Sequence, residues 1–146
     1  MKVVILGCGR LGARVALKLI KNEKNSVIVI DKNPDAFSLL GKDFTGKVLQ
    51  GDGANMETYE EAMKETADVF LALTNSDNTN IMAAEIANQK YKVEKAIAKV
   101  DDPIRAKAFE ELGIQTICPT LLCEKRLSKM IEKTKTAKES EVDEDV

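Results

Sequence analysis

The sequence contains no histidine, few aromatic residues and no long apolar segment. The absence of histidine excludes Ser-His-Asp and Cys-His nucleophile systems, histidine-ligated zinc and acid–base catalysis by an imidazole. No apolar run approaches the roughly 18 residues that a membrane-spanning helix requires. Aromatic residues make up only 4% of the chain and the formal net charge is −2, so we expect no nucleic-acid partner.

Cysteine is also scarce, and the N-terminal residues lack the features of an export signal. Three cysteines, an odd number without metal-type spacing, are typical of reduced thiols in the cytoplasm. The chain runs from Met1 directly into the strand-like segment Lys2–Leu6, with no long apolar region or small-residue cleavage site. We therefore expect a cytoplasmic protein, and its 146 residues are typical of one domain with a substantial core.

The charges are unevenly distributed along the chain. Residues 139–146 contain five acidic residues and no basic residue. Such a composition is typical of a solvated and disordered tail. We therefore predict a folded domain over residues 1–133 and an acidic, disordered tail over residues 134–146.

Apolar periodicity predicts alternating strands and helices. Short apolar or β-branched runs predict six strands, at Lys2–Leu6, Ser26–Ile30, Lys47–Leu49, Ala67–Leu73, Ala96–Val100 and Gln115–Cys118. Helical spacing predicts helices at Leu11–Lys21, Pro34–Leu40, Glu57–Lys64, Asn80–Tyr91, Pro103–Leu112 and Leu121–Lys133. This alternation predicts an α/β fold, a Rossmann-like doubly wound parallel sheet of six strands in the order 3-2-1-4-5-6, with a C-terminal helix beyond the sheet.

The most informative motif is Gly7-Cys8-Gly9-Arg10-Leu11-Gly12, a G-x-G-x-x-G pattern between the first predicted strand and helix. Gly7 permits a tight turn, Gly9 lets backbone approach a pyrophosphate, and Gly12 lets the helix pack close to the strand. Phosphates would lie at the helix N-terminus, where free N–H groups and the helix dipole favour an anion. The motif predicts a nucleotide-binding loop.

An acidic residue completes the nucleotide-binding pattern. Asp31 closes the second strand, 19 residues after Gly12, which is the distance at which a carboxylate meets the ribose hydroxyls. Its charge disfavours the 2′-phosphate of NADP, although Lys32 offsets part of that repulsion. Arg10 has two interpretations: a guanidinium that reaches over the phosphates of ADP or ATP, or a solvated side chain on the first helical turn.

Further polar groups follow the later strands at their carboxyl ends, where ligands bind in such sheets. Asp52 and Gly53 follow the third predicted strand, Thr74 and Asn75 follow the fourth, and Lys99 lies near the end of the fifth. Each residue alone is typical of a loop. Their shared position at one edge of the sheet favours a role in the same cleft.

Together these segments resemble the N-terminal lobe of the RCK family, also called KTN (TrkA-N type). The resemblance covers about residues 1–133 and rests on Gly7–Gly12, Gly51-Asp52-Gly53, Ala67–Asn80, Ala98–Pro103 and Leu112–Pro119. The family includes regulatory domains of potassium channels and of Trk and Ktr potassium uptake systems. Lys99 departs from the arginine that is usual at its position. Many family members carry a second ligand-binding lobe, whereas only Thr134–Val146 follow the last predicted helix in this sequence, so we assign no function of that lobe to it.

The resemblance implies a cytoplasmic regulatory subunit rather than an enzyme. It would bind an adenine nucleotide, NAD(H) or ADP/ATP, and gate a membrane-embedded potassium transporter or channel from the inner face of the membrane. Conformational change within a homodimer, or a ring of dimers, would carry the regulation. The implied phosphate contacts come from Gly7, Cys8, Gly9, Arg10 and Leu11 and the ribose contact from Asp31, with Asp52, Gly53, Thr74, Asn75 and Lys99 lining the rest of the cleft.

The last predicted helix bears an apolar face, and the sequence is compatible with two surfaces that could cover it. Its residues are Leu121, Leu122, Leu127, Met130 and Ile131. The face is either a dimer surface or a surface that packs back on the sheet of the same chain.

Two alternative functions also remain open. A small NAD-dependent oxidoreductase needs a proton donor near the nicotinamide and a substrate pocket, and Tyr59 and Tyr91 both lie in helical patterns. A redox-sensing module is the other alternative, because Cys8 lies near a helix N-terminus that could lower the pKa of its thiol. Cys8 is also small enough simply to fill a tight loop.

Overall fold

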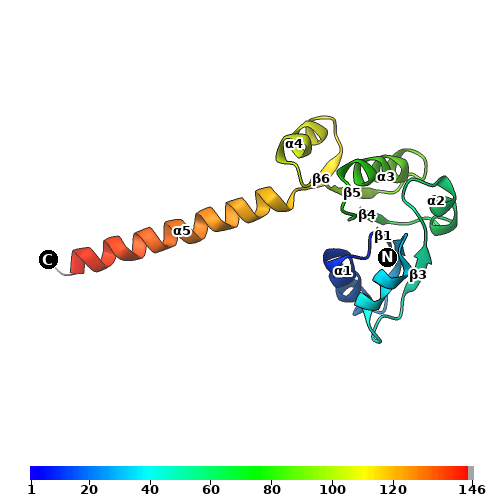
Figure 1. The fold of residues 1–146 in the computed structure, drawn as a ribbon, viewed down its shortest axis with the longest axis horizontal. Helices are drawn as coiled ribbons and strands as arrows, with labels where there is room; N and C mark the ends of the chain where they lie inside the picture. The colour runs from blue at the N-terminus through cyan, green and yellow to red at the C-terminus, as the bar shows by residue number, and fades with distance from the viewer. Residues whose placement is uncertain (145–146) are drawn as a thin grey trace.

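The molecule is built on one open parallel sheet with helices on both faces and a long helix projecting from one end (Figure 1). The computed structural model describes residues 1–144. Its elements are β1 (Lys2–Leu6), α1 (Arg10–Ile20), β2 (Ser26–Asp31), the 3₁₀ helix η1 (Pro34–Leu40), β3 (Lys47–Gln50), α2 (Met56–Ala62), β4 (Val69–Ala72), α3 (Asp77–Gln89), β5 (Lys95–Lys99), α4 (Pro103–Glu111), β6 (Gln115–Ile117) and α5 (Pro119–Glu144). The strand order β3-β2-β1-β4-β5-β6, with every neighbouring pair parallel, confirms the predicted fold.

Strand β1 lies at the centre of the core because both of its faces are buried. Val3 and Ile5 pack on the side of α1 and η1, whereas Val4 and Leu6 pack on the side of α2 and α3. A continuous apolar run, rather than an alternating one, is what a strand covered on both faces requires. The carboxyl end of β1 is thereby held in a fixed place, and the glycine loop begins there.

The start of α3 and the type of the helix at Pro34–Leu40 differ from the predictions for local reasons. Helix α3 begins at Asp77 rather than Asn80, because the Ser76 side chain caps the helix and accepts a hydrogen bond from the N–H of Thr79. The segment Pro34–Leu40 is a 3₁₀ helix, capped by Asn33. Both caps lie at the carboxyl edge of the sheet, so the starts of these helices face the same region as the glycine loop.

Helix α5 continues well beyond the predicted end at Lys133. It runs to Glu144, so the structure differs from the expected disordered tail over residues 134–144, while residues 145–146 lie outside the described part. No glycine or proline follows Pro119, and lysine, glutamate and alanine are good helix formers. The hydroxyls of Thr134 and Thr136 also donate to carbonyls one turn back, so they do not compete with the helix. Whether the chain divides at residue 133 stays a prediction.

Only the base of α5 packs against the rest of the domain. Leu121 contacts the core, but Leu122, Leu127, Met130 and Ile131 are all more than half exposed. The helix extends away from the sheet rather than folding back on it (Figure 1). Of the two interpretations of its apolar face, packing against the sheet of the same chain is therefore excluded for these four residues. None of the helices within residues 1–144 combines the length and apolarity needed to cross a membrane.

Candidate functional site

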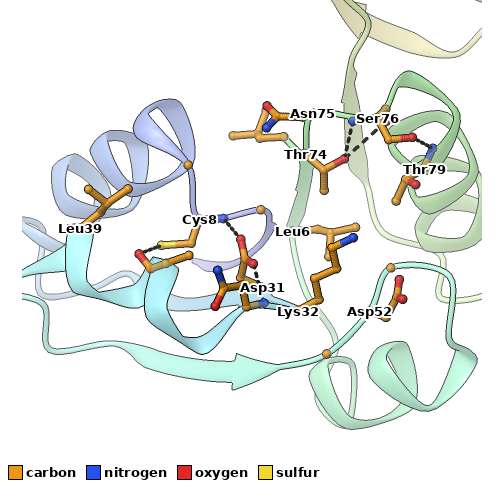
Figure 2. Close-up of a pocket in the computed structure, with 17 residues that line it drawn as sticks. Leu6, Cys8, Asp31, Lys32, Leu39, Asp52, Thr74, Asn75, Ser76 and Thr79 are labelled. Carbon is orange, nitrogen blue, oxygen red and sulfur yellow. Dashed lines mark hydrogen bonds between the residues drawn. The ribbon is translucent and has the colours of Figure 1, made fainter.

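A cleft of about 580 Å³ lies at the carboxyl ends of β1 to β4, where the strand order reverses between β1 and β4 (Figure 2). This reversal is where doubly wound sheets bind their ligands. Seventeen residues line the cleft: Leu6, Gly7, Cys8, Gly9, Asp31, Lys32, Asn33, Ala36, Leu39, Gly51, Asp52, Gly53, Leu73, Thr74, Asn75, Ser76 and Thr79. Nine of the thirteen predicted site residues are therefore brought together here.

The glycine loop forms one wall, and its glycines differ in what surrounds them. Gly7 has a φ of +107° and donates its N–H to the carbonyl of Ile30 at 2.7 Å. A Cβ on Gly12 would lie 2.0 Å from the carbonyl oxygen of Gly7, so glycine is required where α1 approaches the loop. A Cβ on Gly9 would meet no atom within 4 Å. The loop therefore leaves space above Gly9 through which a ligand can approach the backbone.

The N-terminus of α1 at this wall suits an anion. Gly9 is the N-cap and provides no side-chain hydrogen bond to the first turn, which contains no acidic residue. The first backbone N–H groups of the helix thus keep their donor capacity, and the helix dipole adds partial positive charge. Lys32 is the one basic residue among the seventeen that line the cleft, so phosphate binding here would depend mainly on backbone donors.

Asp31 connects the end of β2 to the glycine loop. One carboxylate oxygen accepts from the N–H of Cys8 at 2.8 Å and the other accepts from the N–H of Asn33 at 2.9 Å (Figure 2). Each oxygen retains a further lone pair for a donor in the cleft. The carboxylate is thus fixed in orientation by the protein and is still able to accept from hydroxyl groups of a ligand.

Cys8 is fully buried beneath the loop, and its thiol donates to the carbonyl of Ala36 at 3.4 Å. Burial raises the pKa of the Cys8 thiol, and the negative charge of Asp31 raises it further. The expectation that the helix N-terminus lowers this pKa is therefore wrong, because burial and the neighbouring carboxylate outweigh the dipole. A thiol with a raised pKa carries little thiolate at neutral pH, which argues against redox sensing at Cys8.

The opposite wall is formed by the turn after β3. Asp52 accepts from the N–H of Ala54 at 2.9 Å, and this turn places Gly53 against the cleft. Tyr59 on α2 is completely buried behind the turn, where its hydroxyl donates to the carbonyl of Gly53 at 2.5 Å. Tyr59 thus supports the wall without lining the cleft.

The Tyr59 hydroxyl is expected to make the stability of the protein depend on pH. Burial, with a smaller contribution from the charge of Asp52, raises the pKa of Tyr59 to about 12. Because the unfolded phenol has a pKa near 10, the contribution of this group to stability is complete below about pH 10 and is lost as pH rises towards 12. We expect Tyr59→Phe to lose about 1 kcal/mol at pH 8 from the missing hydrogen bond. Urea unfolding at pH 8 and above pH 10 measures both effects, and an equal loss of stability in the two proteins above pH 10 would contradict the assignment.

The third wall contains the segment from Thr74 to Thr79, between β4 and α3. Asn80, fully buried behind it, accepts from the N–H of Thr74 at 2.9 Å and from its hydroxyl at 2.6 Å. The amide group of Asn80 also donates to the carbonyls of Thr74 and Lys99, both at 2.9 Å. Asn80 therefore satisfies all four of its hydrogen-bonding positions by joining the ends of β4 and β5.

Four predicted site residues do not line the cleft. Arg10 and Leu11 lie exposed on the first turn of α1, and Gly12 lies buried under the loop. The side chain of Lys99 lies 4.0 Å from the carboxylate of Asp101. Its carbonyl is held by Asn80, so this lysine takes part in the connection between strands rather than in the cleft lining.

Sequence reasoning missed eight lining residues, for identifiable reasons. They are Leu6, Asn33, Ala36, Leu39, Gly51, Leu73, Ser76 and Thr79. The apolar members have the same spacing as core residues, so periodicity alone does not separate them from the core. Ser76 and Thr79 could have been found from the capping pattern of α3, because a Ser at the N-cap of a helix that follows β4 must lie at the carboxyl edge.

The fold and the cleft define a doubly wound, Rossmann-like domain with a ligand-sized cavity at its topological switch point. The family model for the TrkA-N domain matches residues 3–119. The chain therefore belongs to the TrkA-N domain family, which confirms the resemblance to RCK regulatory domains.

A curated relative and two solved structures place the chain among known proteins. It is 39% identical over 117 residues to the Trk system potassium uptake protein TrkA of Streptomyces coelicolor, covering 80% of this chain and 52% of that protein. The chain thus spans about half the length of that relative. The RCK domain of GsuK has the same fold, with a TM-score of 0.74 and 20% identity over 93% of this chain and 29% of its own. The Kef CTD of Shewanella denitrificans in AMP-bound form also has this fold, with a TM-score of 0.69 and 22% identity over 87% of this chain and 77% of its own.

Proposed function

We propose that this chain is the nucleotide-binding part of a regulatory subunit that controls a potassium transporter or channel. The observation that carries the proposal is the arrangement at the switch point, where the open space above Gly9, the uncapped N-terminus of α1 and the carboxylate of Asp31 face one cleft. Family membership and the naming of the Streptomyces relative support the link to potassium uptake.

The ligand is an adenine nucleotide, NAD(H) or ADP/ATP. Its phosphates bind at the backbone of Gly7–Leu11, with Arg10 reaching over them from the exposed first turn, and its ribose hydroxyls donate to Asp31. Ala36 and Leu39 line the cleft and would supply an apolar surface for the adenine ring. AMP in the Kef structure supports an adenine nucleotide, and the carboxylate of Asp31 disfavours NADP.

The partner is a membrane-embedded potassium transporter or channel subunit, reached from the cytoplasmic face of the membrane. The chain acts as a homo-oligomer, a dimer or a ring of dimers. The exposed apolar residues of α5, Leu122, Leu127, Met130 and Ile131, supply a surface for such assembly. Ligand binding changes the geometry of the assembly only if one arrangement binds the nucleotide better than another.

We infer a regulatory rather than a catalytic role. Neither Tyr59 nor Tyr91 is among the residues that line the cleft, so neither is placed to exchange a proton with a nicotinamide. The raised pKa of Cys8 removes the support for a redox module.

Thermal unfolding with AMP, ADP, ATP, NAD and NADH tests nucleotide binding. A ligand at 100 times its Kd adds about 2.7 kcal/mol to the free energy of unfolding, which raises the Tm by several degrees. We expect at least one nucleotide to produce this shift and Asp31→Ala to abolish most of it. Each variant is compared with its own ligand-free melt, so a general loss of stability is separated from a loss of binding. A folded chain that shows no shift with any of the five nucleotides would sink the proposal.

A further inference from the structure

The middle of α5 concentrates positive charge in a chain that is otherwise acidic. Residues 124–138 contain six basic and two acidic residues, which gives this segment a net charge of +4, whereas the whole chain has a net charge of −2. The six basic side chains are all exposed, on a helix that projects away from the sheet (Figure 1). They are Lys125, Arg126, Lys129, Lys133, Lys135 and Lys138. The positive charge is therefore carried at a distance from the acidic remainder of the molecule.

Four of these residues share one side of the helix, called here the basic face. Its members are separated by three, four, seven or eight residues, which are the separations that bring side chains together on a helix. They are Lys125, Arg126, Lys129 and Lys133. Lys129 lies two residues from both Leu127 and Ile131, which is a rotation of about 200° around the helix axis. The basic face is thus turned away from these two apolar residues, so α5 has separate surfaces for a charged and for an apolar partner.

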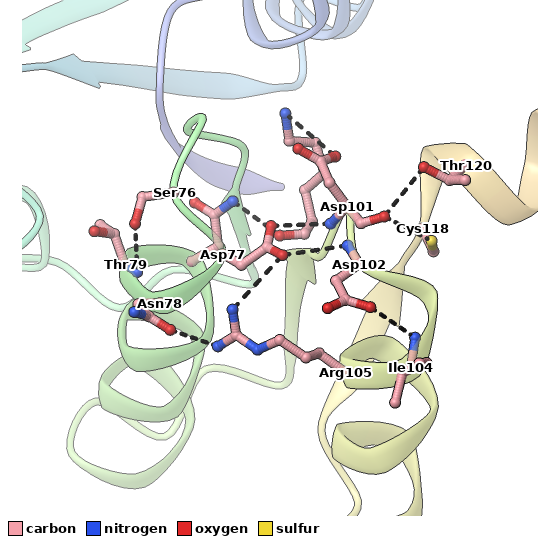
Figure 3. Close-up of polar contacts among 12 residues, drawn as sticks. Ser76, Asp77, Asn78, Thr79, Asp101, Asp102, Ile104, Arg105, Cys118 and Thr120 are labelled. Atoms are coloured by element: carbon pink, nitrogen blue, oxygen red, sulfur yellow. Dashed lines mark hydrogen bonds and ion pairs between the residues drawn. The ribbon is translucent and has the colours of Figure 1, made fainter.

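The charges of the basic face are not neutralised within the described residues. Glu132 lies at its edge, three residues after Lys129, but no ion pair joins any member of the face to a carboxylate in the part of the chain that the structure describes. Arg105 on α4 shows the contrast, because its guanidinium lies 3.8 Å from the carboxylate of Asp77 and donates to the side chain of Asn78 (Figure 3). The cation on α4 is engaged by the protein, whereas those of the basic face are available to another anionic surface.

We propose that the basic face of α5 binds the surface of an anionic phospholipid membrane. Clusters of four or more lysines and arginines on one side of a helix are attracted to anionic lipid headgroups. From Lys125 to Lys133 the helix rises about 12 Å in a straight line, so the face matches a plane of headgroups rather than a pocket. The choice of lipid rests on the proposed function, which brings the chain to the cytoplasmic face of a membrane.

The distribution of charge along α5 limits the contact to the middle of the helix. Glu139 and Glu141 follow the basic residues and are exposed, so an anionic surface repels the far end. Leu127 and Ile131 remain on the opposite side, where they are free for assembly with a second copy. A dimer carries two basic faces, and two linked sites bind a surface more tightly than one. Lipid binding and self-assembly therefore support each other.

Co-sedimentation with vesicles tests the proposal on the unsubstituted chain without nucleotide. Vesicles of phosphatidylglycerol mixed with phosphatidylcholine are anionic, whereas vesicles of phosphatidylcholine alone have no net charge. We expect the chain to bind only the anionic vesicles and to dissociate from them as salt is raised, because salt screens exposed charges. The absence of binding to the anionic vesicles, or equal binding to both kinds, would overturn the proposal.

A double substitution, Lys129→Gln with Lys133→Gln, removes two charges from the basic face. We expect it to weaken binding to the anionic vesicles about 30-fold, from about 1 kcal/mol per basic residue and 1.4 kcal/mol per factor of ten. Lys129→Arg with Lys133→Arg retains both charges and is expected to retain the affinity. An unchanged affinity in the glutamine variant would show that another surface binds the lipid and would overturn the assignment.

Lys18→Gln with Lys42→Gln is the matched control. Both lysines are exposed, Lys18 on α1 and Lys42 shortly after η1, so the net charge changes by the same amount without touching α5. The affinity for anionic vesicles is expected to stay unchanged. An equal loss in the control and in the α5 variant would mean that the total charge, rather than the basic face, determines binding.

The acidic end of α5 in a second copy is the competing occupant of the basic face. Analytical ultracentrifugation without vesicles is expected to give the same assembly for the unsubstituted chain and the α5 glutamine variant. Loss of assembly in that variant, with vesicle binding unchanged, would assign the face to a second copy instead. The Tm shift with nucleotide separates the two proposals. A chain that shows this shift but binds no anionic vesicles loses only the lipid site, and a chain that binds the vesicles through its basic face without any shift loses only the proposed nucleotide site.

Discussion

Replacing Gly12 with alanine is expected to lower the free energy of unfolding by about 2–3 kcal/mol, or the Tm by about 5–10 °C. Two effects oppose each other at this position. Alanine in a helix interior gains roughly 1 kcal/mol over glycine, but the added methyl group would lie 2.0 Å from the carbonyl oxygen of Gly7 and 3.1 Å from its carbon. Both contacts are with backbone, which has no rotamer to change, so the steric cost is the larger effect. Differential scanning calorimetry measures the net change.

Gly9→Ala is the matched control for that substitution. The same methyl group at Gly9 meets no atom within 4 Å, and the φ of −82° suits any residue. Its stability is therefore expected to stay within about 0.5 kcal/mol of the unsubstituted chain. Nucleotide binding should weaken at least about tenfold, since the methyl group occupies the approach to the backbone. A Gly12→Ala protein that melts at or above the temperature of the unsubstituted chain would show that the loop and α1 are not in close contact.

The sheet could be predicted from the sequence because its signals are local. Buried parallel strands such as Lys2–Leu6 are continuous apolar runs, and each is followed by a glycine or polar turn. Once six strands alternate with helices, the right-handed crossover rule leaves few strand orders to choose from. The glycine loop was predictable for the same reason, since all of its glycines and the distance to Asp31 lie within one βαβ unit.

The missed features depend on contacts between distant segments. The sequence position of Asp77 shows only that it is acidic in the first turn of α3, because its partners Asp101 and Asp102 lie 24 and 25 residues away. The raised pKa of Cys8 likewise depends on burial under η1 and on Asp31. The length of α5 differs from the prediction for another reason: an acidic composition favours disorder, but this segment contains no glycine or proline to end the helix.

The segments that carried the family resemblance have a structural role that sequence alone did not reveal. Thr74, Asp77 and Asn80 belong to the segment Ala67–Asn80 that carries the resemblance. In the structure only Thr74 lines the cleft, while Asp77 and Asn80 bind the loop and strand behind it. The motif therefore shapes the wall of the cleft and connects it to β5.

Substitution of Asn80 tests how much the connection between the wall of the cleft and β5 contributes to stability. We expect Asn80→Leu to cost about 4 kcal/mol, because the N–H and carbonyl of Thr74 and the carbonyl of Lys99 all lose their partner in a part-buried position. Each such group costs about 1–3 kcal/mol when left unsatisfied. Leucine has the same number and branching of side-chain heavy atoms as asparagine and is larger in volume, so the loss does not report a cavity. Urea unfolding gives the value, and a loss below about 1 kcal/mol would mean that these groups find other partners.

Asn80→Asp replaces the N–H donors of this side chain with a second oxygen and keeps its acceptor. The introduced carboxyl still accepts from Thr74, but when ionised it presents a negative oxygen to the carbonyls of Thr74 and Lys99. Burial and these two carbonyls raise its pKa in the folded state above the unfolded value near 4. Relative to the unsubstituted chain, the stability of the Asn80→Asp protein is therefore highest below about pH 4 and falls as pH rises through the folded pKa of the introduced carboxyl. We expect the difference in stability between the two proteins to be smaller at pH 5 than at pH 8. Asn80→Leu, which has no group that titrates, should show no such difference, and a flat profile for Asn80→Asp would show that water, rather than the carbonyls of Thr74 and Lys99, surrounds this position.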